Sequence, residues 1–215
     1  MLVLGLDTSS AAVSAVAVEV SVGVQVLARA TTINARGHGE RLAPNIAVCL
    51  NEIGAVSADL GAVVVGTGPG PFTGLRVGLV TAAVLSETLG VPAYGVCSLD
   101  ALAAHPGALL VASDARRREV YWGHYRDGTR LRGPEVSRPV DVPTDGVAAM
   151  AGAGARLYAD TFGLRLLDGD HPDPAVLVRC AQDRVCAGAP SDPLTPLYLR
   201  RPDAVKPGAP KRVTR

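Results

Sequence analysis

Short apolar runs separated by glycine- and proline-rich turns dominate the chain, and most of them have the length of a β-strand. The run at 2–6 is continuously apolar, which is typical of a buried strand. Strand-like runs at 13–18 and 24–32 follow it through short turns. Three successive strands joined in this way predict an antiparallel edge on a mixed sheet.

A first helix is expected from about residue 40 to residue 53, because apolar side chains recur there at helical spacing. They are Leu42, Ile46, Cys49, Leu50 and Ile53. Proline is tolerated only near the first turn of a helix, so Pro44 favours a start at Glu40 or Arg41.

A second helix is expected from near Thr73 to about Leu89, and it is apolar over most of its surface. A helix that is apolar on nearly every face must be covered on nearly every face. Two arrangements satisfy this requirement: the helix is internal to the domain, or another subunit covers one of its faces.

The loop before this helix is rich in glycine and follows an apolar strand at 62–65. Its glycines are Gly66, Gly68, Gly70 and Gly74. Thr73 is placed to cap the helix, and strand, loop and helix N-terminus together form an anion-binding geometry. The alternative is a tight strand-to-helix turn without a ligand. The loop matches neither a Walker A nor a dinucleotide-binding pattern, so its spacing alone names no ligand.

Two halves of the chain share a layout. Leu109–Asp114 repeats Leu2–Asp7, an apolar strand that ends in aspartate, and the run at 120–125 takes the place of the run at 13–18. This echo indicates a duplicated domain, as in actin-like and sugar-kinase-like ATPases. We therefore expect one lobe over 1–105 and a second over 106–204.

Within the second lobe a helix is expected over about 175–187, and a basic, proline-rich tail at 205–215 is expected to be disordered.

Three positions carry candidate chemistry. Asp7 ends a buried strand, where acids often meet a phosphate-bound metal, although an Asx-type bond to its own turn is the alternative. Arg116–Arg118 are placed to meet phosphate, or they form a solvated hairpin tip. His38 has Leu42 four residues on, where a helical metal pair needs a second ligand, so no metal is expected.

Composition narrows the class of protein. The 215 residues are 48% hydrophobic and 19% charged, which is typical of an ordered globular protein. The net charge of +1 does not favour nucleic-acid binding by this chain alone. The chain opens without a basic n-region and its longest uncharged run is too short to span a bilayer, so we expect no signal peptide and no membrane contact. The four cysteines lack zinc-type spacing and favour thiols in a reducing cytosol.

The longest specific motif is Gly-Thr-Gly-Pro-Gly-Pro-Phe-Thr-Gly-Leu-Arg-Val-Gly, from Gly66 to Gly78. It resembles the signature of the TsaB (YeaZ) family, the non-catalytic paralogue of TsaD in tRNA threonylcarbamoyladenosine (t6A) synthesis. Three more stretches match the pattern of that family, at 5–10, 38–44 and 114–121, and 196–200 fits its C-terminal end.

The resemblance implies an α/β, actin-like, duplicated ribonuclease-H-like fold of two lobes, with mixed sheets flanked by helices. It implies a cytoplasmic protein that binds and activates TsaD for threonylcarbamoyl transfer to the adenosine next to the anticodon of tRNAs reading codons that begin with A. TsaE joins this complex as an ATPase, and tRNA is met indirectly through the complex. No catalytic residue and no metal are expected in this chain.

The resemblance also implies a degenerate ATP site. Its candidate residues are Asp7, Thr8, Ser9, Gly66, Gly68, Gly70, Thr73 and Gly74. No cofactor is expected, and ATP or ADP at this loop stays open as an alternative. In that reading the chain is a small actin-like ATPase or kinase that uses Asp7 and the loop. Metallopeptidase activity fails on the missing second histidine.

In the family, the two helices of the first lobe pack against a second copy or against TsaD, which implies a homodimer when the chain is free. The interface candidates are Leu42, Ile46, Leu50, Leu75, Arg76, Leu79, Val80 and Ala83.

Overall fold

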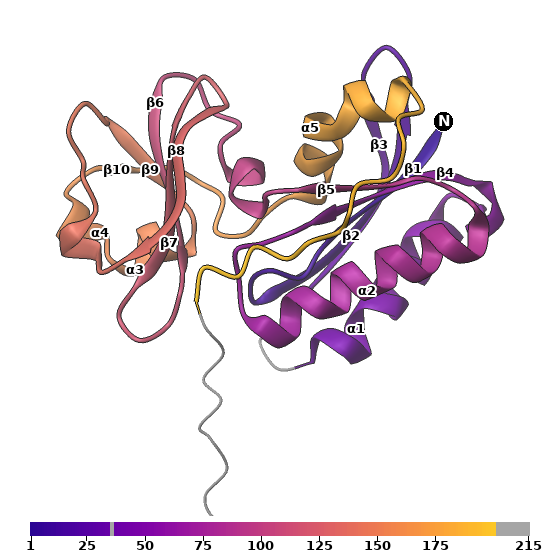
Figure 1. Ribbon diagram of the computed structural model, residues 1–215, viewed down its shortest axis with the longest axis horizontal. Coiled ribbons are helices and arrows are strands. Elements are labelled where there is room, and N and C mark those ends of the chain that lie inside the picture. Colours follow the sequence, from indigo (N-terminus) through magenta and orange to yellow (C-terminus); the bar gives the residue numbers. More distant parts are fainter. Residues whose placement is uncertain (35–36, 201–215) are drawn as a thin grey trace, which may run out of the picture.

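The computed structural model describes residues 1–34 and 37–200. The expected tail at 205–215 lies outside the described residues. The described chain forms two lobes side by side, each built on its own five-stranded sheet (Figure 1).

The first sheet has the order β3-β2-β1-β4-β5. Its strands are β1 (Leu2–Asp7), β2 (Ala12–Val20), β3 (Val24–Ile33), β4 (Leu60–Gly66) and β5 (Ala93–Val96). β2 is antiparallel to both β1 and β3, whereas β4 is parallel to both β1 and β5. The expectation of an antiparallel edge on a mixed sheet is confirmed.

The second sheet repeats this plan as β8-β7-β6-β9-β10. Its strands are β6 (Ala108–Asp114), β7 (Val120–Arg126), β8 (Thr129–Ser137), β9 (Ala149–Ala151) and β10 (Arg165–Leu166). β6 pairs antiparallel with β7 and parallel with β9, as β1 does with β2 and β4. The internal echo therefore reflects a duplicated ribonuclease-H-like unit, and the fold is α/β and actin-like.

The helices of the first lobe are longer than those of the second. In the first lobe, α1 (His38–Glu52) and α2 (Phe72–Leu89) cover one face of the sheet. In the second, α3 (Ala153–Leu157) and α4 (Ala159–Phe162) are short. The 3-10 turns are η1 (Ser57–Asp59), η2 (Ser98–Leu102) and η3 (Pro139–Asp141).

The last helix, α5 (Pro174–Cys186), returns to the first lobe. It covers the face of the first sheet opposite α1 and α2 (Figure 1), and Leu177 and Val178 pack there against Val3 and Val16. Beyond α5 the chain still follows this lobe, since Asp192 N donates to Ala93 O and Leu197 N to Thr67 O. The division at 105/106 thus misplaces the C-terminal part of the expected second lobe, because α5 belongs to the first core.

α1 begins two residues earlier than expected. It starts at His38, so Pro44 lies in the second turn and not in the first. The early start is fixed by the His38 ring, whose Nε2 lies 2.7 Å from Ser10 O and ties the helix to the β1–β2 turn. A tertiary contact has therefore outweighed the cost of proline inside the helix.

α2 is covered on one face only. Leu75, Leu79 and Ala82 are buried against the first sheet, whereas Val80 and Val84 are 59% and 57% exposed. Of the two arrangements expected for this helix, the one in which α2 is fully internal to the domain is therefore excluded for a single copy of the chain.

By length and composition alone, α2 is also apolar enough to cross a membrane, and it is the one helix of the described residues that passes this test. One such helix is weak evidence, because core helices of soluble proteins pass it too. The packing of α2 on β4 and β1 identifies it as a helix of the fold.

Candidate functional site

Asp7 stands at the end of β1 and is enclosed by the chain. Its Oδ1 accepts from Ser9 N at 2.9 Å and Ser9 Oγ at 2.8 Å, and its Oδ2 accepts from Ser98 Oγ at 2.7 Å. The side chain is 1% exposed. Burial raises its pKa, although the bonds from Ser98 and Ser9 act in the opposite direction. The Asx-type bond weighed as an alternative is present, and both carboxylate oxygens already have partners.

Thr8 follows Asp7 and inserts its hydroxyl into α2. Its Oγ1 donates to Gly74 O at 2.7 Å and accepts from Gly78 N at 3.0 Å. These two groups are four residues apart, the spacing of a helical hydrogen bond. The first turns of α2 are thereby anchored to the end of β1.

The glycines of the loop are needed for contact with this same turn. A Cβ at Gly66 would lie 1.9 Å from Asp7 Oδ2, one at Gly70 would lie 2.2 Å from Ser9 O, and one at Gly74 would lie 2.7 Å from Thr8 O. Gly68 has φ +95, which side chains rarely adopt. The glycines therefore allow the loop to pack closely against the turn at Asp7–Ser9 of the same chain.

Thr73 does not cap α2. The helix begins at Phe72, its N-cap is Pro71, and no side chain bonds the cap. Thr73 is exposed. Pro71 supplies an extended backbone before the first turn. The start of α2 is therefore set by the loop and by the Thr8 hydroxyl, which bonds Gly74 and Gly78 of the helix.

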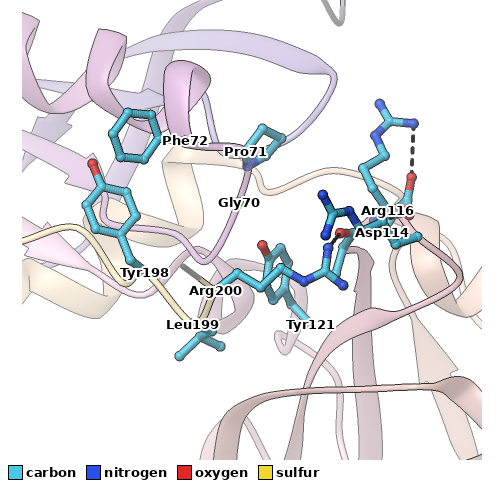
Figure 2. A pocket seen from close by; sticks show the side chains of 11 residues that line it. Gly70, Pro71, Phe72, Asp114, Arg116, Tyr121, Tyr198, Leu199 and Arg200 are labelled. Atoms are coloured by element: carbon cyan, nitrogen blue, oxygen red, sulfur yellow. Dashed lines mark hydrogen bonds and ion pairs between the residues drawn. The ribbon is translucent and has the colours of Figure 1, made fainter. Parts of the chain in front are cut away.

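A cavity of about 230 Å³ lies where the two lobes meet. The first lobe contributes the loop residues Gly70 and Pro71 with the start of α2. The second lobe contributes the turn that follows β6, and the C-terminal segment closes a third side (Figure 2). The remaining lining residues are Phe72, Asp114, Ala115, Arg116, Arg117, Tyr121, Tyr198, Leu199 and Arg200. Gly70 of the loop and two of the three arginines singled out in the sequence, Arg116 and Arg117, thus face one space.

Phe72 and Tyr198, which line this cavity, form a cluster with Arg76 that periodicity does not reveal. Phe72 and Tyr198 stack with ring centroids 5.0 Å apart (Figure 2). The Arg76 guanidinium lies 4.0 Å from the centroid of the Phe72 ring, and its Nε donates to Tyr198 OH at 3.0 Å. The sequence signals for this cluster were Phe72 and Tyr198, two aromatic residues in stretches that hold few others.

A second cavity, of about 170 Å³, is lined by residues of both lobes. Ser10 and His38 line it from the first lobe, and Asp170 and His171 from the second. The Nδ1 of His171 is buried without a hydrogen-bond partner, and burial lowers the pKa of this ring although the nearby Asp170 acts in the opposite direction. Among the described residues, no three His, Cys, Asp or Glu side chains gather as a metal-binding group.

The partner-interface candidates divide into two sets. Five of them are enclosed in the core of the first lobe: Leu42, Ile46, Leu50, Leu75 and Leu79. Arg76, Val80 and Ala83 are exposed on α2. A buried side chain offers no surface to a partner, so the interface candidates are corrected to the exposed face of α2, which includes Phe72 and Val84.

Comparison with known proteins places the chain. The family model for TsaD, tRNA N6-adenosine threonylcarbamoyltransferase, matches residues 26–158. The tRNA threonylcarbamoyladenosine biosynthesis protein TsaB of Escherichia coli is 32% identical over 167 residues, which cover 69% of this chain and 70% of that protein. The chain belongs to the TsaB family.

Further relatives are similar over most of this chain. YeaZ from Pseudomonas aeruginosa superimposes with a TM-score of 0.78 and 28% identity, covering 92% of this chain and 99% of that structure. An uncharacterised protein of Mycobacterium tuberculosis is 49% identical over 94% of this chain and 93% of its own length. One of Mycobacterium leprae is 48% identical over 94% of this chain, which spans 56% of that relative. The two lobes, the glycine loop and the enclosed Asp7 thus belong to a member of the TsaB family.

Proposed function

We propose that this chain is a non-catalytic subunit that binds TsaD and activates it for threonylcarbamoyl transfer. The acceptor is the adenosine next to the anticodon, where t6A forms, in tRNAs that read codons beginning with A. TsaE is the second protein partner, and the free chain is a homodimer in the cytoplasm. The Escherichia coli relative is a tRNA threonylcarbamoyladenosine biosynthesis protein, which supports the assignment to this pathway.

The observation that carries the proposal is the filling of the glycine loop by the chain's own turn. Ser9 O and Thr8 O occupy the space that the missing Cβ atoms of Gly70 and Gly74 leave, so these glycines accommodate the chain itself and not a ligand on that side. The Asp7 carboxylate, which the ATPase alternative requires, accepts three hydrogen bonds within the chain and is 1% exposed. These residues do not fit a nucleotide phosphate or its metal, so we assign the chain no catalytic step.

The exposed face of α2 supports the partner-binding half of the proposal. Val80 and Val84 lie one helical turn apart, both more than half exposed, and Phe72 is 38% exposed two turns before Val80. Apolar side chains in such a row are typical of a helix that another protein covers. We place the contact with TsaD, and with a second copy in the free protein, on this face.

The test is a reconstituted modification assay with TsaD and TsaE from the same organism. Threonylcarbamoyl-adenylate is generated in situ, unmodified tRNA is the acceptor, and t6A is measured by mass spectrometry after digestion of the tRNA. We expect t6A only when this chain is present with TsaD and TsaE, and none from the chain alone. Equal modification without the chain would overturn the proposal.

Calorimetry of the purified chain with ATP and magnesium tests the competing ATPase assignment. We expect no heat of binding, because the Asp7 carboxylate that a bound nucleotide and its metal require is enclosed and already accepts three hydrogen bonds within the chain. Binding that disappears in an Asp7→Asn variant would return the glycine loop to consideration as an active site.

A further inference from the structure

The turn between β6 and β7 holds three consecutive arginines in an unusual backbone conformation. Arg116, Arg117 and Arg118 have φ of 61, 55 and 61, all in the left-handed region. That region is unfavourable for every residue with a Cβ, and glycine or asparagine is the ordinary occupant. The turn is closed by Ala115 N, which donates to Glu119 O at 3.0 Å, and by Glu119 N, which donates to Arg116 O at 3.0 Å.

The strain keeps three long cations on one exposed tip. All three arginines are exposed. Arg116 is tied to the strand end, since its N donates to Asp114 Oδ1 at 2.8 Å and its Nη1 lies 3.2 Å from Asp114 Oδ2. Its side chain is nevertheless 66% exposed, so this pair leaves the guanidinium accessible to a second anion. Strained backbone that displays particular side chains points to a function for those side chains.

A fourth arginine joins the turn from the other end of the chain. Arg200 Nη1 donates to Ala115 O at 2.8 Å, and Arg200 also pairs with Glu119. The tip therefore gathers four arginines against two acids, Asp114 and Glu119. Five more basic residues and one acid follow Arg200 in the sequence. Nine of the 21 basic residues of a chain with net charge +1 thus fall in 116–118 and 200–215.

The surroundings of this tip suit an extended anion. The turn lines the cavity of about 230 Å³ together with the start of α2, whose first N–H groups carry the positive end of the helix dipole. Tyr121 and Tyr198 add aromatic surface to the same lining (Figure 2). Arginines beside aromatic rings are the chemistry that contacts the backbone and the bases of RNA.

We propose that the arginine turn, Arg116–Arg118, together with Arg200, binds the phosphate backbone of tRNA directly. The inference rests on the proposed function, because tRNA is the polyanion on which the proposed complex acts. It goes beyond an indirect role through TsaD by giving this chain a contact surface of its own. Neutralising phosphates releases counterions, so binding through this tip weakens as salt rises.

The test compares variants of the full chain for binding to a fluorescein-labelled, unmodified tRNA transcript by anisotropy at several salt concentrations. The variant R116G/R117G/R118G removes three charges and places glycine where φ is positive, so the fold is kept. The matched control R126S/R165S/R179S removes the same charge from exposed positions elsewhere in the fold. We expect the glycine variant to bind at least about tenfold more weakly and to lose about two units of the slope of log affinity against log salt. The control should lose less than about threefold.

Each other result decides against the proposal. Equal loss in both variants would mean that only net charge matters, and unchanged affinity in the glycine variant would exclude the turn. No binding of tRNA by the unaltered chain at low salt would also overturn it, and binding to anionic lipid vesicles in its place would assign the tip to a membrane surface. The thermal midpoint of the glycine variant verifies folding. The reconstituted assay with the unaltered chain tests the proposed function separately from tRNA binding by the arginine turn. If that assay forms t6A while the glycine variant binds tRNA as tightly as the unaltered chain, only the inference about the arginine turn is overturned.

Discussion

The residues of the β1–β2 turn determine how the first lobe is assembled. Asp7 joins β1 to η2 through Ser98, and Thr8 joins β1 to α2 through Gly74 and Gly78. Each of these bonds is buried, where an unpaired polar group is costly. The fold therefore depends on small side chains at this turn more than its short length suggests.

Gly70→Ala should destabilise the protein by about 1–3 kcal/mol, because the added Cβ would lie 2.2 Å from the carbonyl oxygen of Ser9 and that backbone has little room to move. Urea unfolding measures the change. Gly39→Ala is the matched control, since no atom lies within 4 Å of a Cβ there and the residue is in α1. The control should stabilise the helix by about 0.5–1 kcal/mol. Equal effects at the two positions would contradict the packing of the loop.

Asp7→Asn should change the pH dependence of stability. Burial raises the pKa of Asp7, so the folded protein holds this proton more tightly than the unfolded chain does. The free energy of unfolding therefore falls as pH rises from below the ordinary pKa of aspartate to above the raised one. Asparagine lacks this titration, so the variant should gain stability relative to the unaltered protein across that window.

Chemical unfolding of both proteins between about pH 3 and pH 8 measures the difference for Asp7. The carboxyl of Asp100, whose pKa burial also raises, is present in both and cancels. A constant difference across the range would mean that the Asp7 carboxyl titrates alike in the folded and unfolded states.

Among the elements, α2 has two faces with different partners. The buried face packs with α1 on the first sheet, and its fit depends on Gly74 and Gly78 beside Thr8. The other face carries exposed valines, and its N-terminal end is held by the stack of Phe72 on Tyr198. The helix thus links the candidate partner surface to the cavity between the lobes.

Val80→Asp should abolish activation of TsaD in the reconstituted assay and leave the fold intact, because Val80 is 59% exposed. Val140→Asp is the matched control: the same change at a side chain that is 72% exposed on η3 of the second lobe should leave activation unchanged. Leu79→Asp should instead unfold the protein, since Leu79 is 5% exposed in the core. Circular dichroism separates the two kinds of loss. Full activation by the Val80 variant would move the interface away from α2.

At the scale of the whole molecule, the two lobes do not correspond to two consecutive halves of the sequence, because the C-terminal part of the chain returns to the first lobe. α5 covers one face of the first sheet with side chains from near the C-terminus, and Asp192 then bonds β5 through Gly95 N at 3.0 Å. Arg184 pairs with the same Asp192 carboxylate. The first lobe is therefore completed by residues that follow the second lobe in the sequence.

A fragment of residues 1–105 should not fold, because one face of its sheet, including Val3, Val16 and Val64, would be exposed without α5. A single chain that joins 1–104 to 172–200 through a flexible linker should fold cooperatively. Thermal unfolding followed by circular dichroism compares the two. A cooperative transition in the short fragment would show that α5 is dispensable for this core.

Sequence reasoning predicted the strands at 2–6, 13–18, 24–32, 62–65, 109–114 and 120–125, the mixed sheet, the duplication and the family, but not β8, β9 or β10. Apolar runs follow directly from burial, and the Gly66 to Gly78 motif is specific. Periodicity could not tell that Leu75 and Leu79 are core residues while Val80 is exposed, because α2 carries apolar residues all round. Nor could it anticipate that Thr8 sits inside α2, or that the glycines accommodate the chain itself.

Only the tertiary structure decided those points, because each depends on contacts between segments far apart in the sequence. Thr8 reaches a helix that starts 64 residues later, and α5 meets strands from the first 66 residues of the chain. A residue pattern reports which side chains prefer to be buried. Which surface buries them, and whether a glycine makes room for a ligand or for a carbonyl of its own chain, is set by how the segments meet.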